Sequence, residues 1–409
     1  MISYRRNLSP AIKQDSIFTK KMTREIRDIL KAFKAARQEG RQTALATVIQ
    51  VEGSSYRRPG ARMLVEDNGR MTGAISGGCL EGDAYRKAML VMAQKQNKLV
   101  TYNSMDNGAD ISFGVQLGCN GIVHILFEPI DPSQPNHPID LLEAACAQRK
   151  EGVLVALFSL QNFHGPQPGT CFFTDGSITK NNIADNHLER IVAEDAMEVL
   201  AQKSSVLKQY SGHPLMGFFE LIQPPVSLIV AGAGNDALPL ADMATVLGWQ
   251  VTIVDGRATH ANIQRFSKAH SIIVEKPEEA IKQITIDERT VFVLMTHNYH
   301  YDLAMMRLLL PKKCRYIGTL GPKRRLERMF AALQEDGITI TREQQSGIYG
   351  PTGLDIAEAP EEIALSILAE IKAVLADRPA NFLRNSPDAI HSRPVNTVDE
   401  TRIHIHNII

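Results

Sequence analysis

The sequence has no long apolar run and no excess of charge of either sign. Its 409 residues include 45 Lys and Arg and 45 Asp and Glu, so the formal net charge is zero. This balance gives no electrostatic basis for nucleic acid or an anionic membrane as the main partner. No stretch reaches the roughly 18 apolar residues of a membrane-spanning helix, and the start of the chain lacks the apolar core of a secretory signal. We therefore expect a cytoplasmic protein that binds neither nucleic acid nor membrane.

Cysteine is scarce and scattered. The five cysteines are Cys79, Cys119, Cys146, Cys171 and Cys314, and no two of them form a C-x-x-C pair. Structural zinc sites need such paired spacings, so this class of site is disfavoured. An odd number of isolated thiols in a long chain is typical of a reducing compartment.

The pattern of predicted elements changes at a Pro-Pro pair, residues 224–225, because prolines cannot continue a sheet ladder. Upstream, helical and strand-like runs are mixed. Downstream, short apolar runs alternate with helical stretches, as in βαβ units on a parallel sheet. The sequence thus predicts an α/β protein with a mixed α+β domain over 22–225, followed by a Rossmann-like parallel-sheet domain over 226–378.

Two polar segments without periodicity flank these domains. Residues 1–21 form an N-terminal extension to which we assign no structure. Residues 379–409 form a polar tail that we expect to be flexible, because it offers too little apolar surface to bury.

The second domain opens with a dinucleotide-binding fingerprint. The strand-like run "VSLIVAG" leads into residues 232–237, "GAGNDA", which fit G-x-G-x-x-A. Gly232 and Gly234 would permit a tight turn and the close approach of a pyrophosphate to a helix N-terminus. Asp255, at the end of the second predicted strand, is placed to bind ribose hydroxyls, while Arg257 leaves room for a 2′-phosphate. NAD(P) is the cofactor that such a site would hold.

A histidine-rich segment, "THNYHYD", follows the fourth predicted strand of this domain. Ligands bind at this end of open α/β sheets. His297, His300 and Asp302 are therefore candidate metal ligands. We prefer the alternative, in which His297 makes a hydrogen bond in the crevice and His300 opens the next helix.

Glycines in the first domain frame arginines and thiols. Arg57 and Arg58 lie in "VEGSSYRRPGARMLV", where clustered guanidiniums would suit an anion such as phosphate. Cys79 follows a Gly-Gly turn in "AISGGCLEGD", and Cys119 follows glycine in "LGCNG". A thiol on such a turn can reach a ligand, but arginines are common on surfaces and free cysteine is often a small core residue. The residues alone leave both interpretations open.

Several motifs, in one order along the chain, resemble a known family. They are "GSSYRRPGARM", "TGAISGGCLEGD", "LGCNG", "GAGNDALPLA", "IVDGR", "MTHNYHYD", "YIGTLG" and "PTGLDIAEAPEEIALSILAEI". Together they are similar to the xanthine dehydrogenase accessory proteins of the XdhC/CoxI family, from about Thr23 to about Ala376. The glycine-cysteine motifs and the last string are specific, whereas a Rossmann fingerprint alone is not.

This resemblance implies a role in the maturation of molybdenum hydroxylases. Members of the family bind molybdenum cofactor (molybdopterin), help supply its terminal sulfido ligand through a cysteine desulfurase, and hand the cofactor to the apo-enzyme. The resemblance therefore implies a molybdenum hydroxylase client of the xanthine dehydrogenase type and a desulfurase as partners. It implies a chaperone rather than a catalyst, and it leaves a homodimer open.

Carried over motif by motif, the resemblance makes Cys79 and Cys119 ligands or sulfur contacts of the metal, because molybdenum is soft enough for thiolate. It makes Arg57, Arg58 and the Ser76-Gly77-Gly78 turn contacts of the pterin phosphate, since backbone N–H nests bind phosphate.

Two residues depart from the family pattern. Tyr56 stands where proline is frequent, so the turn before Arg57 can differ. Asn120 replaces a second glycine after Cys119, although Asn tolerates left-handed conformations better than most residues.

Two other functions use the Rossmann-like half. One is an NAD(P)-dependent oxidoreductase, for which His297 is the best proton donor that the sequence offers. The other is a pyridine-nucleotide sensor, in which a bound nucleotide changes the domain arrangement. Turnover of reduced nicotinamide would favour the first, and binding without turnover the second.

Overall fold

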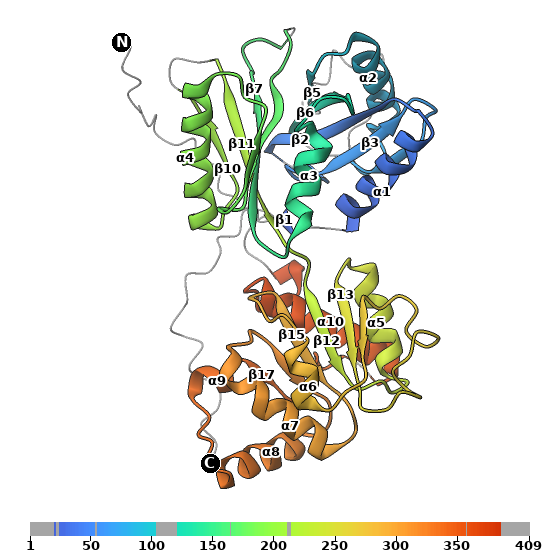
Figure 1. Ribbon diagram of the computed structural model, residues 1–409, viewed down its shortest axis with the longest axis vertical. Helices are drawn as coiled ribbons and strands as arrows, with labels where there is room; N and C mark the ends of the chain where they lie inside the picture. The colour runs from blue at the N-terminus through green and yellow to red at the C-terminus, as the bar shows by residue number, and fades with distance from the viewer. Residues whose placement is uncertain are drawn as a thin grey trace. The chain divides into compact units, whose positions relative to one another are not determined.

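The structure is a computed structural model (Figure 1) of a chain that divides into two compact units, Met1–Pro224 and Pro225–Ile409. The described residues are 20–21, 24–53, 55–103, 121–163, 165–210, 214–356 and 358–385. Most of the predicted N-terminal extension and most of the predicted flexible tail therefore lie outside the described residues.

The first unit contains a five-stranded antiparallel sheet in the order β4-β3-β2-β6-β5. Its strands are β2 (Thr43–Gly53), β3 (Arg62–Glu66), β4 (Met71–Gly73), β5 (Lys98–Asn103) and β6 (Gly121–Ile130). The Asn68-Gly69 pair, a sequence that by itself predicts a tight hairpin, makes the turn between β3 and β4, with Gly69 at φ 89°. Helix α2 (Glu81–Gln94) packs on one face of this sheet through small apolar side chains such as Ala84 and Ala88.

A second sheet packs on the other face. It has the order β1-β11-β7-β8-β9, with β10 also paired to β11. Its strands are β1 (Lys20–Lys21), β7 (Gly152–Phe158), β8 (Gly169–Thr174), β9 (Thr179–Asn181), β10 (Val206–Gln209) and β11 (Met216–Gln223). Ile49 and Leu126 of the first sheet meet Phe158 and Phe218 of the second. The antiparallel pairs and the helices make this unit the mixed α+β domain that the sequence predicts.

Three further helices complete the first unit. Helices α1 (Arg24–Gln38) and α3 (Pro138–Ala147) contribute to one core with residues of both sheets. Helix α4 (Asn186–Gln202) covers the outer face of the second sheet (Figure 1). The predicted elements do not include α4, although Asp185 caps its start and Val192, Ala196 and Val199 form a stripe at helical spacing.

Charged side chains are buried between the two sheets. Arg62 of β3 forms an ion pair with Glu220 of β11 at 2.5 Å, and their side chains are 2% and 0% exposed. Glu128 of β6 accepts hydrogen bonds from the backbone N–H and the hydroxyl of Thr170, at 2.6 and 2.8 Å. Burial raises the pKa of Glu128 to about 7. This interior therefore holds one guanidinium and two carboxyl groups, one of which titrates near neutral pH.

The second unit is a parallel sheet in the order β14-β13-β12-β15-β16-β17. Its strands are β12 (Ser227–Ala231), β13 (Gln250–Val254), β14 (Ser271–Ile273), β15 (Thr290–Leu294), β16 (Ile317–Thr319) and β17 (Ile348–Tyr349). Helices α5 (Ala237–Val246) and α10 (Pro360–Leu375) pack on one face. Helices α6 (Pro277–Lys282), α7 (Tyr299–Leu309) and α8 (Lys323–Glu335) pack on the other. The short elements are η2 (Leu310–Lys312), α9 (Arg342–Ser346) and η3 (Leu383–Asn385).

This arrangement confirms the predicted Rossmann-like fold. Strand β12 pairs with β13 on one side and with β15 on the other, so the strand order reverses at β12. The carboxyl ends of β12 and β15 therefore border the topological switch point, where ligands of such sheets bind. In the described part of the chain, no helix combines the length and apolarity needed to cross a bilayer.

Candidate functional site

Two segments that the sequence indicated separately lie against each other in the first unit. We call residues 55–61, between β2 and β3, the arginine loop, and residues 74–80, between β4 and α2, the cysteine turn. Arg57 Nε donates a hydrogen bond to the carbonyl oxygen of Ala74 at 3.0 Å. The structure thus brings the predicted guanidinium next to the turn that carries the predicted thiol.

Ser76 organises the cysteine turn from within. Its Oγ accepts hydrogen bonds from the N–H groups of Gly78 and Leu80, at 3.0 and 3.1 Å, and donates one to Glu81 Oε2 at 2.5 Å. Gly78 has φ 112°, a conformation that side chains rarely adopt. Cys79 follows it and is exposed. The turn therefore keeps this thiol at the surface.

Tyr56, the departure from the family pattern, lies over the same turn. Its ring would be 3.5 Å from a Cβ placed on Gly77, so it is in contact distance of the glycine backbone. The side chain is nevertheless 71% exposed. An exposed aromatic ring thus covers the glycine turn that precedes Cys79.

Arg57 already has an anionic partner, Glu25 of α1. Its Nη2 forms an ion pair with one carboxylate oxygen of Glu25, and the other oxygen accepts the backbone N–H of Arg62 at 3.3 Å. Burial lowers the pKa of Arg57, and the negative charge of Glu81 partly opposes this effect. Burial also lowers the pKa of Arg58. Both guanidiniums remain charged at neutral pH. An anion bound at Arg57 must therefore share the guanidinium with Glu25.

Cys119 lies outside the described residues. The residue two positions after it, Gly121, begins β6 and pairs with Gly53, the last residue of β2. Gly53 in turn leads into the arginine loop. The convergence of Cys79 and Cys119 on one ligand stays a prediction.

The other thiols are structural. Burial raises the pKa of Cys171 to about 12 and the pKa values of Cys146 and Cys314 to about 11 each. A thiol with such a pKa remains protonated at neutral pH and is a poor metal ligand. Among the described cysteines, Cys79 is the exposed one.

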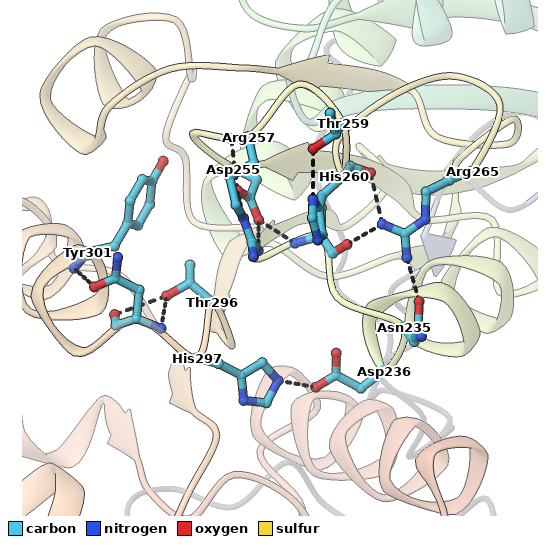
Figure 2. Close-up of polar contacts among 12 residues, drawn as sticks. Asn235, Asp236, Asp255, Arg257, Thr259, His260, Arg265, Thr296, His297 and Tyr301 are labelled. Carbon is cyan, nitrogen blue, oxygen red and sulfur yellow. Dashed lines mark hydrogen bonds and ion pairs between the residues drawn. The ribbon is translucent and has the colours of Figure 1, made fainter.

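In the second unit, the predicted fingerprint forms a tight loop after β12, residues 232–236, which we call the glycine loop. Gly232 has φ 128°, and a Cβ there would lie 2.4 Å from the carbonyl oxygen of Met295. Arg265 donates to the carbonyl oxygen of Ala233 and to Asn235 Oδ1, both at 2.7 Å (Figure 2). The loop is thus fixed against β15 and against Arg265.

Asp255 lies at the end of β13, where the sequence placed it. One carboxylate oxygen accepts the N–H of Ala233 at 2.8 Å and Arg257 Nη2 at 2.7 Å. The other accepts the N–H and Nε of Arg257, at 3.0 and 2.9 Å. Burial alone would raise the pKa of Asp255, but these hydrogen bonds lower it below its ordinary value. The carboxylate therefore joins β13 to the glycine loop.

His297 faces the glycine loop across the switch point. Its Nε2 lies 2.8 Å from Asp236 Oδ2, and its backbone has φ 57° (Figure 2). His300 lies in the first turn of α7. Asp302 points elsewhere, accepting Thr296 Oγ1 at 2.6 Å. The described residues contain no group of three or more His, Cys, Asp or Glu able to hold a metal.

Two family descriptions match the chain. Residues 36–103 match the XdhC and CoxI family, and residues 228–371 match the XdhC Rossmann domain. A Bacillus subtilis (strain 168) protein, described as a probable xanthine dehydrogenase subunit, is 30% identical over 337 residues, which cover 82% of this chain and 93% of that protein. The chain belongs to the XdhC and CoxI family.

Two further similar proteins are consistent with membership of the XdhC and CoxI family. The "Molybdenum cofactor insertion chaperone PaoD" of Escherichia coli (strain K12) is 24% identical over 354 residues, covering 86% of this chain and 90% of PaoD. A crystal structure described as a xanthine dehydrogenase from Bacillus halodurans has a TM-score of 0.70 and 29% identity, covering 88% of this chain and 98% of that one. The arginine loop and the cysteine turn lie within the first matched family range, and the glycine loop lies within the second.

Sequence reasoning missed the acids of this family member that hold its loops. Glu25 lies far from Arg57 along the chain, so no local pattern links the two. Glu81 lies in the motif around Cys79, but the motif does not show that this acid anchors Ser76. Asp236 was read only as a variable position of the fingerprint, although an acid at the start of a helix in a phosphate-binding motif is a usable signal.

Proposed function

We propose that the chain is an accessory protein of a molybdenum hydroxylase of the xanthine dehydrogenase type, which binds molybdenum cofactor and hands it to the apo-enzyme. The observation that carries this proposal is the hydrogen bond between Arg57 and Ala74. It places a guanidinium and the exposed thiol of Cys79 on two neighbouring segments. PaoD, a relative along most of its length, is described as an insertion chaperone for this cofactor.

The donor set of the first unit suits this ligand. The cofactor, when bound, supplies a soft metal centre with sulfur ligands and a phosphate group. Cys79 would contact the metal or its sulfur, because a soft centre accepts thiolate. Arg57 and Arg58 would hold the phosphate, because guanidinium pairs with phosphate oxygens. Cys119 stays a predicted second sulfur contact.

The cysteine turn would act mainly as a frame. The N–H groups of Gly78 and Leu80 are bonded to Ser76 Oγ. Ser76, Gly77 and Gly78 would therefore position the thiol, and any phosphate contact from this turn would come from its remaining backbone. A cysteine desulfurase as sulfur donor and a homodimer belong to the same proposal. Affinity capture with the client and desulfurase, and light scattering of the purified protein, test them.

The direct test is the content of the purified protein. Wild type and Cys79→Ser are isolated anaerobically from molybdenum-sufficient cells, and molybdenum and the fluorescence of oxidised pterin are measured on the same sample. Wild type is expected to carry both in equal amounts, and Cys79→Ser to lose at least about tenfold of both, the scale seen when a metal site loses a supporting group. Cys314→Ser, in the second unit, is the matched control and should retain both. Wild type without pterin, or equal loss in the two variants, would refute the proposal.

A further inference from the structure

The glycine loop of the second unit differs from a dinucleotide site in the space beside Gly234. In Rossmann folds the second glycine has no side chain so that the backbone can approach a pyrophosphate. Here a Cβ placed on Gly234 would lie only 2.4 Å from Asp236 Oδ1. The carboxylate of Asp236 therefore fills the space that the glycine leaves open, next to the first residue of α5.

Two interactions hold this carboxylate in place. His297 Nε2 lies 2.8 Å from Asp236 Oδ2 and approaches from the loop after β15, on the other side of the switch point (Figure 2). The N-terminus of α5 also favours a negative charge, as helix N-termini do in general. Asp236 is only 19% exposed, whereas His297 is 67% exposed. The acid is thus the inner member of the pair, and the imidazole covers it.

The backbone around the carboxylate is braced. The N–H of Ala233 is bonded to Asp255 at 2.8 Å, and its carbonyl oxygen is bonded to Arg265 at 2.7 Å. A side chain at Gly232 would collide with Met295. Because these contacts hold both backbone polar groups of Ala233, the residue before Gly234, the loop has little freedom to move away from Asp236.

Asp255, the acid expected to bind ribose hydroxyls, is also engaged by groups of the chain itself. Each carboxylate oxygen of Asp255 already accepts two hydrogen bonds, from Ala233 and Arg257. Asp255 is 3% exposed. A ribose diol would have to displace Arg257 before it reached this acid.

We propose that the Rossmann unit of this chain carries its own anion in place of a dinucleotide pyrophosphate, and that Asp236 is the residue that excludes NAD(P) in the usual pose. The carboxylate takes the space beside Gly234, and its charge repels a second anion from the same helix end. A ligand without an anionic group at this point would not meet this repulsion. This inference concerns the second unit and holds whether or not the first unit carries cofactor.

The test is a gain of binding in the full-length protein. NADH is titrated while its fluorescence is followed, and ADP-ribose is titrated by calorimetry. Wild type should not saturate at millimolar ligand. Asp236→Ala and Asp236→Asn should bind both ligands at least about tenfold more tightly, because juxtaposed like charges oppose association strongly.

Two controls separate the carboxylate from other effects. Asp242→Asn removes the same charge from the same helix, but Asp242 is an exposed residue paired with Lys268 and should behave as wild type. His297→Ala removes one of the two interactions that hold the carboxylate but leaves its charge, so it should gain less affinity than either Asp236 variant. Thermal melts verify folding, and if Asp236→Ala does not fold, Asp236→Asn alone decides. Tight NADH binding by wild type, no gain in either Asp236 variant, or an equal gain in Asp242→Asn would overturn the proposal.

Discussion

The cysteine turn of the first unit and the glycine loop of the second both place a glycine at positive φ, Gly78 at 112° and Gly232 at 128°. They differ in what stands beside the glycines. In the cysteine turn a neutral hydroxyl, from Ser76, takes up the backbone N–H groups and leaves the thiol exposed. In the glycine loop a carboxylate, from Asp236, fills the open space. Glycine opens room for a ligand, but the neighbouring side chain decides whether that room stays available.

The largest difference between the two loops is expected when a methyl group is added to each. Gly232→Ala should destabilise the protein by about 3 kcal/mol or more, because strained φ adds to a collision with the backbone of Met295. Gly78→Ala should cost only about 1 kcal/mol, since no atom beyond the two neighbouring residues lies within 4 Å of the added Cβ and φ alone is strained. Urea unfolding of both variants measures the difference. Equal losses would show that the loops are equally tolerant.

The buried carboxyl group between the two sheets gives the first unit a pH-dependent stability. Glu128 has a pKa of about 7 in the folded chain against an ordinary 4.5. Between these values the folded state holds a proton that the unfolded state has lost, so stability falls as pH rises through this window. A pKa difference of this size lowers the free energy of unfolding by about 3 kcal/mol across the window. The pKa of Asp255 in the second unit is lowered instead of raised. The stability that this carboxylate contributes is therefore lost only when the pH falls.

Glu128→Gln removes this dependence. Relative to the variant, wild type should lose stability between pH 5 and pH 8, as measured by urea unfolding at several pH values. The variant also shows how much of the remaining pH dependence belongs to other groups. A constant difference between the two proteins across this range would contradict a near-neutral pKa for Glu128.

Ser76→Ala sharpens the contrast between hydroxyl and carboxylate. The N–H of Gly78 would lose its acceptor, and the N–H of Leu80 would keep only Glu81 Oε2 at 3.1 Å. The expected cost is about 1 kcal/mol, with faster reaction of Cys79 with a thiol reagent because the turn loosens. Ser177→Ala, which lies on an exposed turn of the same unit, is the control. An unchanged rate at Cys79 would mean that Ser76 does not position the thiol.

The smallest expected change is in phosphate affinity, when Glu25 no longer competes for Arg57. Glu25→Gln should raise the affinity of the first unit for inorganic phosphate about two- to fivefold, since a partly exposed ion pair contributes up to about 1 kcal/mol. Calorimetry measures the change. Glu39→Gln, in an exposed ion pair with Arg41, is the control. Unchanged affinity in Glu25→Gln would place phosphate away from Arg57.

Much of the fold could be predicted because it follows from local patterns. Apolar β-branched runs predicted β12, β13 and β15, and an Asn-Gly pair predicted the β3–β4 hairpin. The stacking of the two sheets of the first unit could not be predicted, because the contact of Arg62 with Glu220 joins residues 158 positions apart.

The sequence predicted which residues belong to the candidate sites, but not which partners those residues already bind within the fold. The sequence brought Arg57 and Cys79 into one hypothesis, and the structure places their segments in contact. It could not tell that Glu25 already pairs with Arg57, because that contact spans 32 positions. The role of Asp255 as a ribose ligand stays a prediction. Its bonds from Arg257, two residues away, depend on a loop conformation that spacing alone does not reveal.

The bond from Arg57 to Ala74 has a consequence for selectivity. It ties the guanidinium to the first residue of the turn that carries Cys79, so the positive charge and the sulfur belong to one connected piece of structure. A guest that engages both groups must carry an anionic part and a thiophilic part in the same molecule. Free phosphate offers nothing to the thiol, and a bare thiophilic cation offers nothing to the guanidinium, so the pairing of the two chemistries becomes a criterion of recognition.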